Sequence, residues 1–222
     1  MNTPAVAFVP VALPSRASGT VPVARPGLAR PPTSPLELAI RAAAGSAEST
    51  GRLVRAVSPN VRLAVRAILG AEHPDLDDAI QLALIAFIQA LPAFRGDCEP
   101  AGYARVIAVR TAIATRKRER AARARRDDDA EPDETARPSN PGGPAWEADE
   151  RRELVRDLLA ELPDEQGETL ALRVGLGLSI EEIAHETSVP VNTVKSRLRL
   201  AKERLRARIE KDAALRDAFD RR

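Results

Sequence analysis

The sequence predicts an all-α protein with two small helical domains, an acidic flexible linker between them, and a disordered proline-rich tail before the first domain. Apolar residues make up 44% of the chain but aromatic residues only 3%, so Ala, Leu, Val and Ile must build the core. That mixture favours packed helices over a β-sandwich or barrel. Apolar residues also recur at helical spacing in two segments, which a run of proline, glycine and acidic residues separates.

Residues 1–34 contain seven prolines and no acidic residue, and no helical or strand periodicity is visible among them. We expect a disordered tail, to which the residues assign no function. The apolar residues near the start are interrupted by proline and follow no basic segment, so we expect no signal peptide. Because no apolar run approaches the ~20 residues that span a bilayer, we expect no membrane insertion and a cytoplasmic location.

Four helices are expected in the first domain, residues 35–126. Ser58 and Pro59 mark a kink or break in the second helix, and the third is expected from about Asp75 to Leu91. The fourth continues into a basic run from Arg116 to Arg126. The apolar positions of the four are Leu36, Ile40 and Ala43; Leu53, Val57, Val61, Val65 and Leu69; Ile80, Leu84, Phe87, Ile88 and Leu91; and Tyr103, Val106, Ile107 and Ile113.

The charge changes sign abruptly after the basic run. Residues 127–149 are acidic, rich in proline and glycine, and predicted to be an extended linker, in which Trp146 is expected to pack on the next helix. Helical periodicity resumes in the second domain, residues 150–212, with leucines at 154, 158, 159 and 162, and a further helix is expected from Glu165 to Leu176. Residues 213–222 are predicted to be a C-terminal tail.

The strongest local pattern lies between Ser179 and Arg206. Ser179 and Glu182 have the spacing of an N-terminal capping box, in which each side chain bonds to the other residue's amide. Residues 186–190 provide a short turn with Val189 pointing inward, and a second helix is expected to start near Val191. A helix, a short turn and a second helix are typical of a DNA-binding helix-turn-helix.

The second of these helices has two distinct faces. At 100° per residue, Val194, Leu198, Ala201 and Leu205 share an apolar face. The neighbouring face carries Lys195, Arg199, Lys202 and Arg206, and the short polar residues Asn192 and Ser196 flank its leading end. Recognition helices place their leading residues at base edges and later cations near phosphates, so this arrangement favours DNA reading over a solvated amphipathic helix.

Other kinds of site find little support. Cys98 is the only cysteine, so neither an intrachain disulfide nor a cysteine-based zinc site can form. His73 and His185 are expected to be exposed residues at helix ends rather than metal ligands. No glycine-rich phosphate loop and no catalytic triad pattern is present, so we expect no enzyme activity, no cofactor and no metal.

These motifs resemble the extracytoplasmic-function class of bacterial RNA polymerase sigma factors. Residues 158–205 resemble the family's domain 4 almost end to end, except that Gly167 stands where arginine is usual and Asn192 where glycine is common. Residues 75–97 and 103–126 are similar to the polymerase-gripping segment and the −10-reading helix of domain 2. In that helix Tyr103, Arg110 and Ala114 replace the usual tryptophan, asparagine and aspartate.

The resemblance implies three sites and no cofactor. Core RNA polymerase would bind Asp78, Gln81 and Leu84. The melted −10 strand would bind Tyr103, Arg105, Arg110, Arg116, Lys117 and Arg118, with residues 95–101 lining a pocket for a flipped base. The −35 duplex would bind Asn192, Thr193, Lys195, Ser196, Arg197, Arg199 and Lys202. An anti-sigma factor is a further candidate partner, and the acidic linker is either a spacer or a segment that threads a basic polymerase channel.

Two alternatives stay open at this stage. A stand-alone helix-turn-helix regulator would use the same C-terminal module, with residues 35–126 serving for dimerisation or sensing. A sigma-like protein that binds polymerase without opening promoters is also consistent with the scarcity of aromatic residues in domain 2.

Overall fold

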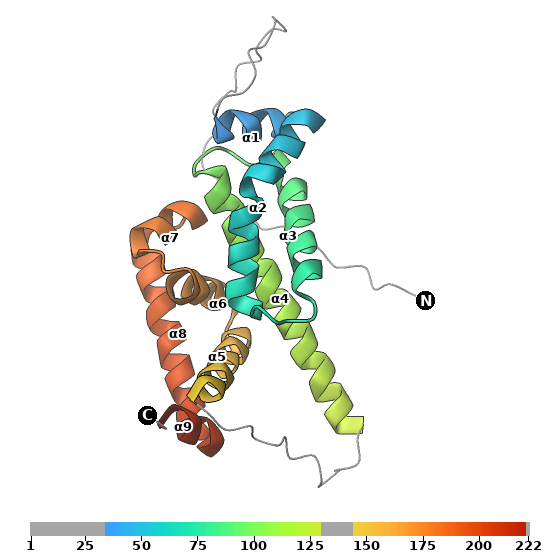
Figure 1. The fold of residues 1–222 in the computed structure, drawn as a ribbon. Helices are drawn as coiled ribbons and strands as arrows, with labels where there is room; N and C mark the ends of the chain where they lie inside the picture. Colours follow the sequence, from blue (N-terminus) through green and yellow to red (C-terminus); the bar gives the residue numbers. More distant parts are fainter. Residues whose placement is uncertain (1–33, 130–143, 221–222) are drawn as a thin grey trace, which may run out of the picture. The chain divides into compact units, whose positions relative to one another are not determined.

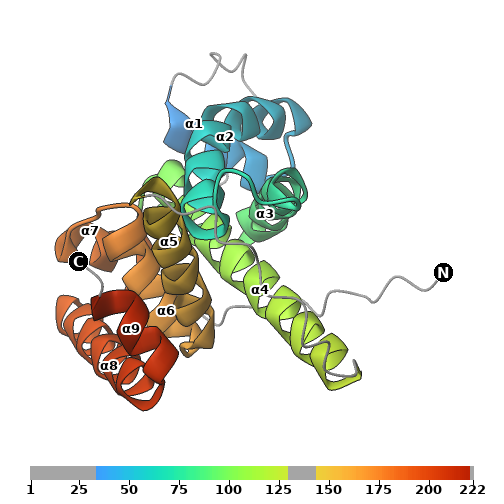
Figure 2. The same cartoon turned by 60° about the horizontal axis from the view of Figure 1, so that its bottom comes forward.

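The structure is a computed structural model that describes residues 34–129 and 144–220. The predicted tail, residues 1–34, lies outside these ranges apart from Ser34, and so does the middle of the predicted linker. The described elements are all helical (Figures 1 and 2). They are α1 (Pro35–Ala43), α2 (Ala47–Leu69), α3 (Leu76–Ala90), the 3-10 turn η1 (Leu91–Ala93), α4 (Pro100–Asp129), α5 (Pro144–Glu161), α6 (Asp164–Leu170), the π-helical turn η2 (Ala171–Gly175), α7 (Ile180–Thr187), α8 (Val191–Lys211) and α9 (Ala213–Asp220).

Local sequence explains where the first helices begin. The Ser34 hydroxyl accepts a hydrogen bond from the Glu37 amide at 3.1 Å, and Ser46 caps α2 in the same way. The α2 helix runs through Pro59 without a break, contrary to the interruption that its sequence suggested. Because the apolar residues before and after Pro59 are buried in one core, tertiary packing outweighs the lost backbone hydrogen bond.

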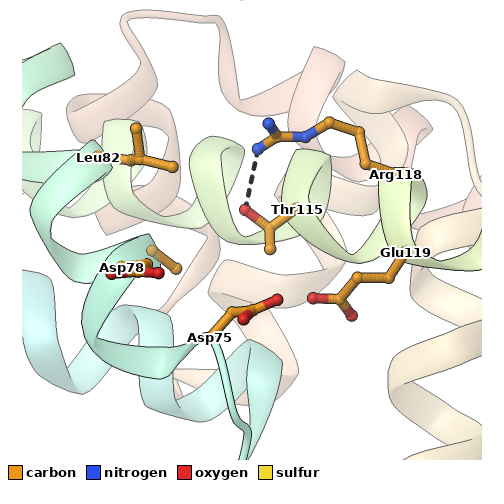
Figure 3. A pocket seen from close by; sticks show the side chains of 7 residues that line it. Asp75, Asp78, Leu82, Thr115, Arg118 and Glu119 are labelled. Atoms are coloured by element: carbon orange, nitrogen blue, oxygen red, sulfur yellow. Dashed lines mark hydrogen bonds between the residues drawn. The ribbon is translucent and has the colours of Figure 1, made fainter. Parts of the chain in front are cut away.

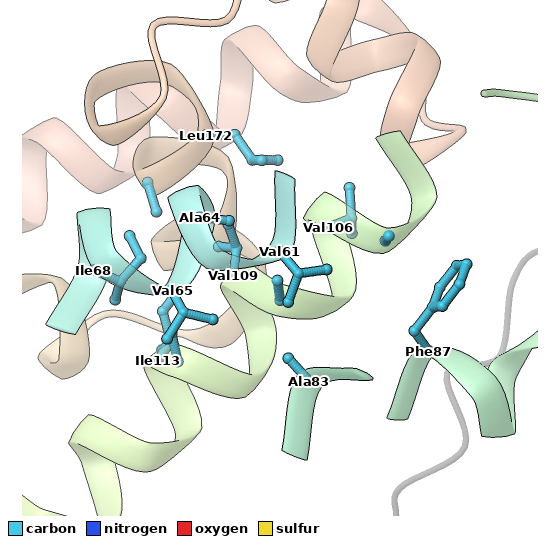
Figure 4. Close-up of a cluster of buried hydrophobic side chains, with 14 of the residues drawn as sticks. Val61, Ala64, Val65, Ile68, Ala83, Phe87, Val106, Val109, Ile113 and Leu172 are labelled. Atoms are coloured by element: carbon cyan, nitrogen blue, oxygen red, sulfur yellow. The ribbon is translucent and has the colours of Figure 1, made fainter. Parts of the chain in front are cut away.

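The helices α2, α3 and α4 pack around one core (Figure 4). Val61 and Val65 of α2 face Val109 and Ile113 of α4, and Phe87 of α3 is fully buried. The α1 helix packs across the end of α2. Small residues of α4, such as Ala108 and Ala112, let the helices approach closely, which explains how so few aromatic residues fill the interior.

The core extends from the first four helices into the C-terminal helices. Leu172 of η2 is fully buried and inserts beside Ala64 and Ile68 of α2 (Figure 4). Leu159 and Leu162 at the end of α5 belong to the same buried cluster, and α4 contacts α5, α6 and α7. The described residues, 34–129 and 144–220, accordingly group as one compact unit. The two predicted domains therefore share an extensive packed interface.

Three sequence expectations need correction. The predicted linker, residues 127–149, is helical at both ends, since α4 continues to Asp129 and α5 begins at Pro144. The position of Trp146 therefore lies in a helix, although the packing of its side chain lies outside the described part. The expected helix Glu165–Leu176 is a short α-helix followed by a π-helical turn, which leaves Val174 65% exposed. The predicted tail contains α9, and Asp212 accepts hydrogen bonds from the first amides of that helix.

Candidate nucleic-acid interface

The helix-turn-helix forms as its sequence predicted. The Glu182 amide donates to the Ser179 hydroxyl at 3.1 Å, and the Ser179 amide donates to the Glu182 carboxylate at 2.7 Å, which completes the capping box. These bonds lower the pKa of Glu182. Ser188 ends α7 in the left-handed region with φ 54°, and the half-buried Val189 then packs inward. The chain therefore turns sharply into α8, which begins at Val191.

One side of α8 is buried and the opposite side is open. Val194, Leu198 and Ala201 lie in the core, as expected. Most of the predicted −35 residues are exposed, namely Asn192, Lys195, Ser196, Arg199 and Lys202. Thr193 and Arg197, in contrast, are half-buried. The Arg197 guanidinium pairs with Glu165 at 2.7 Å, away from the open face. The pair of Arg199 with Glu203 is exposed on both sides and leaves that arginine accessible.

Tyr103 is packed into the first four helices. Its ring centroid lies 6.2 Å from that of Phe87 and 5.2 Å from that of Phe94, and its hydroxyl donates to the Ala90 carbonyl at 3.3 Å. Burial raises the pKa of Tyr103, so the hydroxyl remains neutral at physiological pH. The ring sits beside the segment 95–101 that the resemblance assigned to a base pocket, where Cys98 is buried.

The next predicted −10 residues along α4 are held by carboxylates of the C-terminal helices. The Arg110 guanidinium donates two hydrogen bonds to Glu168 of α6, at 2.5 and 3.0 Å, and the side chain of Glu168 is only 7% exposed. Arg105 pairs with Glu186 of α7. Burial raises the pKa of Glu186, and the charge of Arg105 opposes that shift.

Arg116 is the most enclosed of these cations, with 3% of its side chain exposed. It donates to Glu153, to Asp157 at 3.1 Å and to the Leu69 carbonyl at 3.3 Å. Burial works against the charge on Glu153, but the hydrogen bonds and charge of Arg116 prevail and lower the pKa of that carboxyl. Lys117 next to it donates to the Leu162 carbonyl at 3.0 Å and to Asp164 at 2.5 Å.

Arg118 points to the opposite side of α4, where a cavity of about 290 Å³ opens between α3 and α4. Figure 3 shows its guanidinium bonded to Thr115, at 3.2 Å. Asp75, Asp78 and Glu119 line the same cavity. The six predicted −10 residues therefore do not form one surface, because four cations face the C-terminal helices while Tyr103 and Arg118 lie elsewhere.

His73, Asp75 and Glu119 have ligand atoms within 4.8 Å of one another, which raises the question of a metal site. The Asp75 amide donates to Nδ1 of His73 at 3.2 Å, so the proton of a neutral ring sits on Nε2 and points at Glu119, 3.0 Å away. A cation at Nε2 would require a proton on Nδ1, facing that amide. The cluster therefore favours a structural role, in which it connects the residues that precede α3 to α4. His73 is also 7% exposed, which corrects the expectation of an exposed histidine.

The predicted polymerase-binding residues lie on α3. Asp78 and Gln81 are exposed, whereas Leu84 is half-buried and packs against the core. The exposed apolar residues beside the first two are Leu82, Ile85 and Ile88, with 37%, 50% and 40% of their surface accessible. Sequence periodicity assigned Ile88 to the core and overlooked the other two.

Residues 76–93 have the length and mean composition of a membrane span, although Asp77, Asp78, Gln81 and Gln89 interrupt the apolar residues. They form an 18-residue segment with a mean hydropathy of 1.4, of which 28% is buried. This composition could have indicated that the solvent-facing side of α3 is apolar, as its core-facing side is.

Comparisons with known proteins find a family match in each half of the chain. The family model for sigma-70 region 2 matches residues 53–122, and the model for sigma-70 region 4 matches residues 152–205. The ECF RNA polymerase sigma-E factor of Escherichia coli (strain K12) is 31% identical over 146 residues, which cover 61% of this chain and 74% of that relative. The protein of that name from Shigella flexneri gives the same values.

Two solved structures are similar at lower identity. CnrH in complex with the cytosolic domain of CnrY is 23% identical, with a TM-score of 0.45 over 81% of this chain and 99% of that one. The sigma factor RpoE in complex with the anti-sigma factor NepR from Bartonella quintana is 21% identical, with a TM-score of 0.41 over 73% of this chain and 97% of that one.

Proposed function

The chain belongs to the extracytoplasmic-function sigma factors, and we propose that it binds core RNA polymerase through α3 and promoter DNA through α8 and α4. As a member of that family it is an alternative sigma factor that directs promoter recognition, and sigma factors are regulatory rather than enzymatic proteins. The region 2 match to residues 53–122 leaves the stand-alone regulator without support. Because sigma factors act with RNA polymerase on promoter DNA, we propose a cytoplasmic location.

One observation carries the polymerase proposal, namely the exposed apolar stripe Leu82, Ile85 and Ile88 beside Asp78 and Gln81. Exposed apolar patches rimmed by polar groups are typical of protein–protein interfaces. The stripe contributes little to the fold of the free chain, because the opposite face of α3 supplies the buried Ala79, Ala83 and Phe87. Its apolar character therefore indicates that it binds another protein.

The DNA proposal for α8 is supported by its open face. Asn192 and Ser196 lie at the leading end of α8, where recognition helices contact base edges, and Lys195, Arg199 and Lys202 continue toward the phosphates. The −10-binding role of the predicted residues of α4 rests on the family resemblance alone. An anti-sigma factor is a third candidate partner by family membership alone.

Pull-down of purified core polymerase tests the docking face. We expect Ile85→Asp, and separately Asp78→Arg with Gln81→Ala, to abolish co-purification while the thermal unfolding midpoint stays within about 2 °C, since these residues are exposed. Glu48→Arg, an exposed charge reversal on α2, is the control and should co-purify like the unmodified chain. Retained binding by both α3 variants would refute this docking site. Run-off transcription with core polymerase on genomic fragments tests promoter-directed initiation itself.

A further inference from the structure

Six carboxylates of the C-terminal helices lie against the cations of α4. We name them the acidic cover: Glu153, Asp157, Glu161, Asp164, Glu168 and Glu186. They come from α5, α6 and α7, and their partners follow one another along α4 as Arg105, Arg110, Arg116, Lys117 and Arg120. The match in charge extends from Arg105 to Arg120 and does not depend on a single contact.

Close apolar packing supports the acidic cover. Leu172 is fully buried between α2 and α4, and Ile113 of α4 belongs to the same cluster. Glycines stand where the two regions come closest. A Cβ on Gly102 of α4 would lie 2.8 Å from Glu186 Cγ, and one on Gly70 would lie 3.1 Å from a guanidinium nitrogen of Arg156. A side chain at Gly102 would require the Glu186 side chain to shift, so a glycine at this position accommodates the close contact between α4 and α7.

The acidic cover occupies the positions that DNA phosphates would need. Arg110 donates from Nε and Nη2 to the two carboxylate oxygens of Glu168, and carboxylates and phosphates accept the same bidentate pair from a guanidinium. Arg116 is 3% exposed, so no phosphate can reach it in this arrangement. Lys195, Arg199 and Lys202 of α8 are exposed, and so are Arg123, Arg125 and Arg126 at the far end of α4.

We propose that this packing is an autoinhibited form, in which the acidic cover neutralises the −10-binding face of α4 in cis and competes with single-stranded promoter DNA for it. The proposal rests on the proposed DNA-binding role of α4. In the free chain the open face of α8 is available to duplex DNA, while Arg105, Arg110 and Arg116 of α4 are paired with carboxylates of the same chain. Productive −10 binding requires the C-terminal helices to leave α4.

Neutralising the acidic cover tests the competition. The variant is Glu153→Gln, Asp157→Asn and Glu168→Gln, and the probe is a 20-nucleotide single-stranded DNA of mixed sequence. We expect affinity at low salt to rise roughly tenfold, and the salt slope to steepen by about 0.7 for each released cation, or about 1.4 for Arg110 and Arg116 together. Glu48→Gln, Glu72→Gln and Glu210→Gln are exposed, change the net charge equally and should leave the slope unchanged. Equal slopes in both triple variants would overturn the proposal.

A reversible cross-link tests the same idea without removing three charges. Gly102→Cys and Glu186→Cys, in a Cys98→Ser background, place two thiols close enough for a disulfide between α4 and α7. We expect the oxidised chain to bind the single strand at least tenfold more weakly than the same chain after reduction. Equal binding before and after reduction would overturn autoinhibition.

Each variant is also assayed for pull-down of core polymerase, which separates two kinds of failure. If the unmodified chain does not bind core polymerase, the proposed function is refuted, whatever the assay of single-stranded DNA binding shows. Polymerase binding together with an unchanged strand affinity in the neutralised and reduced chains refutes only the autoinhibited form.

Discussion

The helices α8 and α4 are both rich in basic residues, but they present them differently. Lys195, Arg199 and Lys202 of α8 lie on an open face, whereas Arg110 and Arg116 of α4 are held by carboxylates from elsewhere in the chain. Both helices combine basic residues with buried apolar residues. The difference shows that a basic run in the sequence does not reveal how much of its charge is available, because neighbours distant in sequence decide that.

The largest effect is expected where apolar packing holds the acidic cover against α4. Leu172→Ala removes a fully buried side chain between α2 and α4, and should lower the free energy of unfolding by about 2–5 kcal/mol in urea titrations. Val174→Ala, two residues away and 65% exposed, is the control and should change it by less than about 0.5 kcal/mol. Similar losses in the two variants would mean that η2 does not anchor the interface.

A smaller effect is expected on the open face of α8. Arg199→Ala should weaken binding to a −35 duplex by about 1–3 kcal/mol if the guanidinium reads a base, and Lys202→Ala should flatten the salt slope by about 0.9. Arg197→Ala is the contrasting change, because its guanidinium pairs with Glu165 and should affect stability more than affinity. Fluorescence anisotropy over a salt series measures all three. A greater loss of affinity for Arg197→Ala than for Arg199→Ala would reverse this assignment.

The smallest effect concerns pH. Arg116 holds the pKa of Glu153 below its ordinary value of 4.5 in the folded chain, so this pair stabilises the fold above pH 4.5, and the contribution is lost as pH falls through the lowered pKa. Because Glu153 is 45% exposed, the contribution should stay under about 1 kcal/mol. Urea titrations from pH 6 to pH 3 should show a smaller loss of stability in Glu153→Gln than in the unmodified chain. Parallel curves would show that the Arg116 pair does not contribute to acid sensitivity.

Local patterns were sufficient for the helix-turn-helix. The capping box of Ser179 and Glu182, the start of α8 at Val191 and the burial of Val194 were all predicted and are all confirmed. Each depends on residues close together in the chain, where backbone hydrogen bonding and helical periodicity determine the outcome.

The same reasoning was less accurate on α3. Periodicity placed both Leu84 and Ile88 on the apolar face of this helix, and Leu84 packs inward as expected, whereas Ile88 is 40% exposed. A helix that is apolar on nearly all sides has no periodicity that distinguishes the face toward its own core from the face toward a partner. Contact with α2 and α4 made that distinction.

The sequence by itself determined the helical class, the recognition helix and the charge reversal that follows α4. Only the tertiary structure decided that Glu153 and Asp157 would face Arg116, and that Glu168 would face Arg110. These partners are separated by 37 to 58 residues, and their ion pairs depend on the burial of Leu172 and Ile113 in one core. Coulomb attraction acts between any acidic and basic residue, so composition cannot determine which residues pair. The close packing of apolar side chains is specific to one arrangement, and that arrangement determines the ion pairs.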